Sequence, residues 1–129
     1  MSRMNASSAS ASGTKNYAPG EDLCLPQWDV YTNSSAASRA EVPYFVDVQS
    51  DVLRGVPARF VVPLMRPGRS LAGLPSRMSP QFEIAGIKLL LVPQEAGPLD
   101  SRMLKRPVAS LRTESHRIVD ALDAVISGV

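Results

Sequence analysis

The sequence is poor in the residues that build metal centres, disulfide frameworks and catalytic triads. Its 129 residues include one cysteine, Cys24, and one histidine, His116. A single cysteine excludes an internal disulfide framework and a metal site made from several cysteines. His116 lies near Ser115 and Asp120, but neighbouring positions on an exposed helix do not form a nucleophilic triad. We therefore expect no catalytic residues, no metal and no cofactor.

Long apolar runs and a strong excess of charge are also missing. The net charge is +2, which is too small to require a nucleic-acid partner on its own. The apolar run from Ile84 to Val92 contains Lys88 and is far shorter than the roughly 20 residues of a membrane-spanning helix. The first residues have no apolar core of a secretory signal. We expect a soluble cytoplasmic protein that does not bind membranes.

The first 25 residues differ in composition from the rest of the chain. Residues 1–25 are rich in serine, alanine and glycine and have no sustained periodicity, which is typical of a flexible extension. The remaining residues have the ordinary composition of one globular domain. The sequence therefore predicts an extension at residues 1–25 and a domain at residues 26–129.

Short alternating segments, separated by turns rich in proline and glycine, follow Pro26. They predict strands at residues 28–32, 43–51, 58–64, 81–85, 87–92 and 108–111. Ala85-Gly86 predicts a hairpin turn between the fourth and fifth of these strands. We expect the alternation to bury Trp28 and Phe60. Residues 33–40 and 94–106 are expected to form loops and turns, and residues 65–78 a long loop or a short helical insertion. Such a pattern is typical of a small, curled, mostly antiparallel sheet or barrel.

The chain ends in a predicted amphipathic helix, within its longest proline-free stretch, Val108 to Val129. Thr113 or Ser115 is suited to cap its start, and Gly128 suits the left-handed residue after its last turn. Helical spacing predicts one buried apolar stripe, made of Ile118, Val119, Leu122, Val125 and Ile126. The expected fold class is mostly β (α+β), with a single C-terminal helix.

Several of these segments together resemble the CcdB toxins of bacterial type II toxin–antitoxin systems. The resemblance is carried by WDVY at residues 28–31, YFVDVQSD at 44–51 and RFVVPL at 59–64, and it continues through residues 80–87, 107–111 and the helix. It covers Pro26 to Val129 in the right order and with nearly the right spacing. VDVQSD followed by VVPL is its most specific part. The resemblance implies an SH3-like β-barrel with a C-terminal α-helix, assembled as a homodimer.

The resemblance also implies a function that depends on protein binding and not on catalysis. CcdB-like toxins poison DNA gyrase, a topoisomerase, by binding its A subunit and trapping the enzyme on cleaved DNA. A CcdA-like antitoxin neutralises them by wrapping a disordered tail over the toxin, which fits the general logic of folding on binding. The antitoxin also acts in autorepression of the operon, so the toxin meets operator DNA only indirectly, through the toxin–antitoxin complex.

The family's gyrase contacts fall on the outer face and tip of the C-terminal helix and just after the second strand. By motif match they correspond here to Val52, Leu53, Asp123, Ile126, Ser127, Gly128 and Val129. The familiar toxin ends in Trp-Gly-Ile, and Ser127 stands in the place of that tryptophan. Truncating a central interface aromatic typically costs roughly 2–4 kcal/mol. Three possibilities follow: a gyrase site with different anchors, a different target, or a non-toxic homologue that still binds the antitoxin.

MazF-like toxins are the alternative, because these metal-independent endoribonucleases share the fold class and use arginine with a hydroxyl or acidic residue. The stretch from Val52 to Phe82 contains no acidic residue and carries Arg54, Arg59, Arg66, Arg69 and Arg77. Such a run could follow a phosphate backbone, although ordinary surface charge is the simpler interpretation. No exposed aromatic residue is expected among these arginines, so base stacking is unsupported. The motifs favour CcdB over MazF.

Overall fold

The computed structural model of the protein describes residues 26–53, 55–68 and 74–128. The predicted extension at residues 1–25 lies outside these residues, as do Arg54, Arg69 and Val129. The regular elements are β1 (Asp29–Thr32), β2 (Tyr44–Asp47), β3 (Ala58–Met65), β4 (Gln81–Ile84), β5 (Ile87–Leu91), β6 (Gly97–Asp100), β7 (Pro107–Ser110) and α1 (Ser115–Ser127). Short 3-10 helices connect them: η2 (Asp51–Leu53), η4 (Ser76–Met78), η5 (Pro93–Glu95), η6 (Ser101–Met103) and η7 (Arg112–Glu114).

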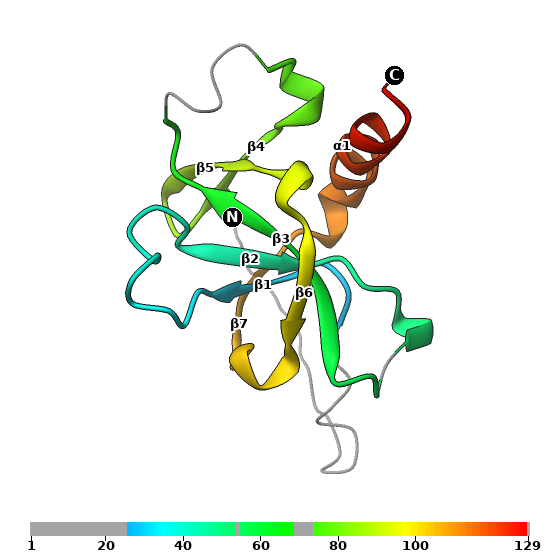
Figure 1. The fold of residues 1–129 in the computed structure, drawn as a ribbon. Helices are drawn as coiled ribbons and strands as arrows, with labels where there is room; N and C mark the ends of the chain where they lie inside the picture. Colours follow the sequence, from blue (N-terminus) through cyan, green and yellow to red (C-terminus); the bar gives the residue numbers. More distant parts are fainter. Residues whose placement is uncertain (1–25, 54, 69–73, 129) are drawn as a thin grey trace.

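Within the described residues, seven strands form one curled antiparallel sheet, which confirms the predicted fold class (Figure 1). The strands follow the order β4-β5-β3-β2-β1-β7, and β6 pairs with β3 away from this path. The long strand β3 pairs with β6 at its first half and with β5 at its end. Strand β6 was not predicted, because its sequence GPLD begins with the two residues that most often mark turns. A proline is tolerated in a strand at a sheet edge.

The predicted hairpin between β4 and β5 is confirmed. Ala85 and Gly86 have φ angles of 53° and 80°, and two successive positive φ angles define the tight turn that matches the right-handed twist of a hairpin. Strand β2, in contrast, ends at Asp47 and not at the predicted Asp51. The chain bends there and continues into η2, so the end of the predicted strand became a loop.

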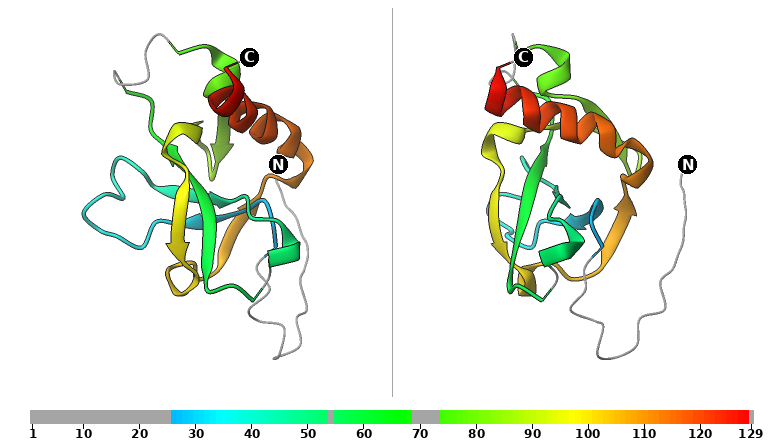
Figure 2. Two further views of the ribbon diagram at one scale, coloured as in Figure 1. Left: turned by 45° about the vertical axis from the view of Figure 1, so that its right-hand side comes forward. Right: turned by 90° about the vertical axis from the view of Figure 1, so that its right-hand side faces the viewer.

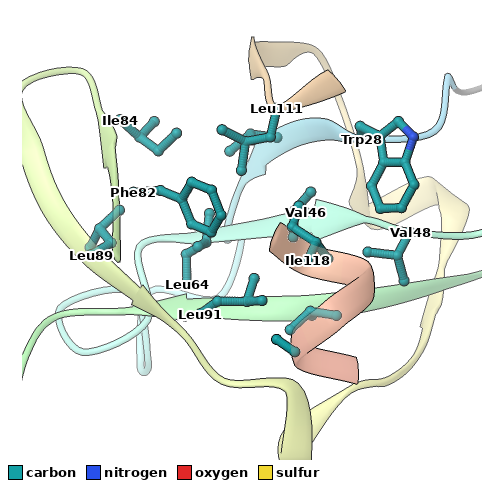
Figure 3. Packing of buried hydrophobic residues seen from close by; sticks show 13 residues of the cluster. Trp28, Val46, Val48, Leu64, Phe82, Ile84, Leu89, Leu91, Leu111 and Ile118 are labelled. Atoms are coloured by element: carbon teal, nitrogen blue, oxygen red, sulfur yellow. The ribbon is translucent and has the colours of Figure 1, made fainter. Parts of the chain in front are cut away.

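The main core lies between the sheet and α1, which crosses one end of the curled sheet (Figure 2). Alternate residues of β2 and β3 point into this core, among them Val46, Val62 and Leu64. Ile118 of α1 packs among them, and the predicted burial of Trp28 is confirmed (Figure 3). Burying large side chains in this way contributes roughly 1.5–3 kcal/mol each.

The predicted buried stripe of α1 is partly wrong. Ile118, Ala121 and Ala124 are buried, whereas Val119 and Ile126 are exposed. The helix turns its small alanines toward the rest of the domain, packing against η4 and η5, and small side chains allow close approach. As a consequence, two of its larger aliphatic side chains face solvent.

The predicted ends of α1 were half right. The helix begins after Glu114 without a side-chain cap, because η7 leads the chain into its first turn, so neither Thr113 nor Ser115 caps it. Gly128 adopts the predicted left-handed conformation, with φ of 77°, and its N–H donates to the carbonyl of Ala124. The start of the helix is fixed instead by Arg117. Its guanidinium stacks 4.3 Å from the centroid of the Phe82 ring on β4.

Candidate functional site

Loop η2 presents two apolar side chains to solvent. Val52 is 87% exposed and Leu53 is 50% exposed, and no residue of η2 is buried. Isolated exposed aliphatic side chains are common, but two at the tip of one loop form a small contact surface. Both residues belong to the gyrase contacts predicted from the sequence, and the structure places them where a partner can reach them.

A buried ion pair joins the end of β2 to β3, shortly before the chain enters this loop. The Arg59 Nε donates to Asp47 Oδ2 at 2.8 Å, and the two side chains are 1% and 0% exposed. The second carboxylate oxygen of Asp47 accepts the backbone N–H of Gln49 at 2.9 Å. Burial raises the pKa of Asp47 above its ordinary value, while the hydrogen bonds from Arg59 and Gln49 oppose this rise.

The side-chain amide of Gln49 joins loop η2 to β3. Its Oε1 accepts the backbone N–H of Phe60 at 2.9 Å, and its Nε2 donates to the carbonyl of Leu53 at 3.4 Å. The backbone pairing of β2 with β3 continues one residue beyond Asp47 and Val61, because the Val48 N–H donates to the carbonyl of Phe60 at 3.0 Å, and the Gln49 amide follows directly after this bond. The polar residues of VDVQSD therefore connect the buried ion pair with the apolar loop.

The tip of α1 is the second predicted contact region. Ile126 is 84% exposed, and Asp123, Ser127 and Gly128 are exposed as well. The Ser127 hydroxyl donates to the carbonyl of Asp123 at 2.7 Å, so this side chain bonds back to its own helix. Ile126 is the large apolar group that the described part of the tip offers to a partner, since Val129 lies outside the described residues.

One chain does not bring the two contact regions together. Loop η2 lies in the lower half of the molecule and the end of α1 near the upper edge in all three views (Figures 1 and 2). Because those views differ only by rotation about the vertical axis, this separation is the same in each. The exposed positions thus form two separate surfaces on the chain.

Phe60 was expected to be buried, and this expectation is wrong. Its side chain is 42% exposed, although it lies on the same face of β3 as the buried Val62 and Leu64. The N-terminal part of β3 extends beyond the main core. Its side chains still alternate between the two faces, but no other described element covers Phe60 fully there. Val56, which follows η2, is also exposed. Alternation alone predicts which face a side chain takes, not how far the core extends along the strand.

Of the described arginines that could follow a phosphate backbone, Arg59 is not available on the surface, whereas Arg66 and Arg77 are exposed. Arg59 is buried in its ion pair with Asp47, and the Arg66 Nε donates to the carbonyl of Ala40. Arg54 and Arg69 lie outside the described residues. In the part of the chain that the structure describes, there is no group of three or more histidine, cysteine, aspartate or glutamate side chains suited to a metal ion. Nor is any helix there long and apolar enough to cross a membrane.

The curled sheet, the helix across its end and the exposed apolar loop define a small barrel-like domain with apolar side chains exposed on its surface. Comparison with protein families identifies it further, because the family described as CcdB protein matches residues 27–128. The chain belongs to the CcdB family, and it is accordingly the toxin component of a toxin–antitoxin system. No curated protein matches the chain.

Proposed function

We propose that this toxin binds the A subunit of DNA gyrase and traps the enzyme on cleaved DNA, acting in the cytoplasm by binding and not by catalysis. The observation that carries the proposal is the exposure of Val52 and Ile126, at 87% and 84%, at two positions that correspond to the family's gyrase contacts. Large aliphatic side chains at interface positions gain free energy when a partner removes them from water.

The proposal includes a homodimer, because the two contact regions lie apart on one chain. In a symmetric pair, the same patch on both chains forms the interface, and surfaces from two protomers can join into one site. Exposed apolar side chains on β3 and α1, Phe60 and Val119, are suitable for such an interface. A CcdA-like antitoxin would then neutralise the dimer by covering the same exposed aliphatic residues.

The anchor at the helix tip differs from the one that the familiar toxin uses. Ser127 offers no aromatic surface, and its hydroxyl already bonds to the carbonyl of Asp123. Losing a central aromatic anchor corresponds to roughly 2–4 kcal/mol, or about one to three orders of magnitude in affinity. The binding energy at this end must come from Ile126 and from complementary residues on the target.

The full-length toxin and the gyrase A subunit of the same host test the proposal. We expect binding, and accumulation of cleaved DNA when the holoenzyme is present. Leu53→Ser and Ile126→Ser should weaken both. Val108→Ser on β7 is the matched control, because Val108 is 52% exposed but belongs to neither contact region. Absence of binding, with the antitoxin still bound, would identify a non-toxic homologue. Cleavage of RNA by the purified protein would instead support the MazF-like alternative.

A further inference from the structure

We infer that Asp47 and Gln49 are positioning residues, which hold loop η2 in the shape that presents Val52 and Leu53 to the partner. The inference rests on the proposed function for its binding readout. Its structural part, the tether between the loop and the domain, can be tested without any partner.

Loop η2 needs such a tether because apolar packing cannot hold it. None of its three residues is buried. Its own hydrogen bonds are local: the N–H of Leu53 donates to the carbonyl of Ser50 at 3.0 Å, and that of Val52 donates to the Ser50 hydroxyl at 3.1 Å. Local bonds of this kind shape a turn but do not fix where the turn lies relative to the rest of the domain.

The long-range connection passes through the Gln49 side chain. One end of its amide is bonded to the carbonyl of Leu53, inside the loop, and the other to the N–H of Phe60, on β3. A single side chain therefore spans from the apolar tip to the longest strand of the sheet. A second contact, from the Gln27 N–H to Asp51 Oδ1 at 3.3 Å, supports the loop from the N-terminal side.

The backbone of Gln49 is itself held by a hydrogen bond to Asp47. The Asp47 carboxylate accepts the Gln49 N–H and is held by Arg59, and all three residues are buried. Hydrogen bonds in a water-poor environment are strong, and each is expensive to leave unmade. The hydrogen bonds among Arg59, Asp47 and Gln49 therefore fix the conformation of the Gln49 side chain. Through its bond to the Leu53 carbonyl, Gln49 in turn fixes the position of loop η2.

A loop that is already ordered loses less conformational entropy on binding. Each interface side chain that becomes ordered on binding costs free energy, and a loop that is ordered beforehand avoids this cost. Removing the tether should therefore weaken partner binding about tenfold, if one or two side chains lose their order. A purely structural role for Gln49 would instead lower stability and leave the affinity of the folded protein unchanged.

Gln49→Met tests the inference, since methionine keeps the length of the side chain and removes both hydrogen bonds of the amide. Asn33→Leu is the matched control. Asn33 is also buried, and its Nδ2 donates to the carbonyl of Val42 at 2.8 Å within the segment that connects β1 with β2. This segment lies on the opposite side of the molecule from η2 and α1 (Figure 1). Both variants remove a buried amide, but only the first one affects η2.

Two measurements are made on the full chain: hydrogen exchange of the Leu53 and Val56 amides, and affinity for the gyrase A subunit. We expect Gln49→Met to speed exchange of these amides and to weaken binding about tenfold, and Asn33→Leu to do neither. If Gln49→Met does not fold, Gln49→Glu replaces it, because the carboxylate still accepts from Phe60 but loses the donor to Leu53. Unchanged exchange in the loop overturns the inference, as does unweakened binding with a loosened loop. If the unaltered toxin does not bind gyrase, the proposed function fails, while the exchange experiment still decides the tether.

Discussion

The two proposed contact regions of this toxin, loop η2 and the tip of α1, are held in place by different interactions. Loop η2 has no buried residue of its own, yet its position depends on a fully buried ion pair through Gln49. The tip of α1 depends on the hydrogen bonds of the helix and on the left-handed Gly128 that ends it. An exposed surface can thus be sensitive to buried polar residues in one place and only to local backbone geometry in another.

Asp47→Ala should have the largest effect, because it removes the buried carboxylate that binds both Arg59 and the backbone of Gln49. The substitution leaves the Arg59 guanidinium buried without its carboxylate, and breaking such a pair typically costs about 3–5 kcal/mol of unfolding free energy. Chemical denaturation measures this loss. Asp47→Leu combined with Arg59→Met is the control, because well-packed apolar replacements should recover much of the stability. A loss below about 1 kcal/mol for Asp47→Ala would show that the ion pair does not support the domain.

Ile126→Ser should weaken partner binding at the tip of α1 and leave the stability of the domain nearly unchanged. The side chain is 84% exposed, so the unfolding free energy should change by no more than about 0.5 kcal/mol. Its loss from the interface should weaken binding to the gyrase A subunit by about tenfold or more. Affinity and denaturation measurements on the same sample separate the two effects. An unchanged affinity would remove the tip of α1 from the contact surface.

Gly128→Ala tests whether the tip of α1 depends on the left-handed conformation of its C-cap residue. Gly128 has a φ of 77°, a conformation that costs an L-residue about 1 kcal/mol. We expect faster hydrogen exchange in the last turn of α1 and no change in loop η2. Gly128→Asn should be milder, because asparagine tolerates the left-handed region better. Equal exchange in the glycine and alanine forms would contradict the role of Gly128 as the helix terminator.

We expect the smallest effects on stability from changes in pH. These effects have opposite signs at the Asp47–Arg59 and Asp100–Arg102 ion pairs, although both have an N–O distance of 2.8 Å. Arg102 lowers the pKa of the exposed Asp100 to about 2, whereas burial raises that of Asp47 above 3.8. Asp100 therefore contributes stability above pH 3.8 that is lost as pH falls toward 2. For Asp47 the folded state binds the proton more tightly, so its contribution decreases as pH rises from 3.8 through the raised pKa. NMR titration of the two carboxyl groups checks both directions. Asp100→Asn should abolish the part of the acid-induced loss of stability between pH 3.8 and about 2 that comes from Asp100; an unchanged pH dependence of the midpoint of thermal unfolding would contradict this.

Much of the fold could be predicted from the sequence because alternation and turn residues are local signals. The Ala85-Gly86 hairpin, the sheet and the C-terminal helix are confirmed on that basis. Strand β6 was missed because its pairing with β3 depends on residues far apart in the chain. The exposure of Phe60 and Val119 could not be predicted either, because periodicity shows on which face a side chain lies but not how far the core that covers this face extends.

The sequence motif indicated the candidate site, but the buried contacts that hold loop η2 in place were not predicted. The motif indicated Val52 and Leu53, and the structure places both on an exposed loop. Asp47 and Gln49 belong to the same hexapeptide, yet nothing in their spacing shows that one binds Arg59 and the other Leu53. Those contacts exist only after β3 folds beside β2, and no local pattern encodes them.

The most direct test of the proposed function is titration of the full-length toxin against the gyrase A subunit of its own host. The account predicts saturable binding that is weakened by Leu53→Ser and by Ile126→Ser and is unchanged by Val108→Ser. No binding by the unaltered toxin, or equal weakening by all three substitutions, would contradict it.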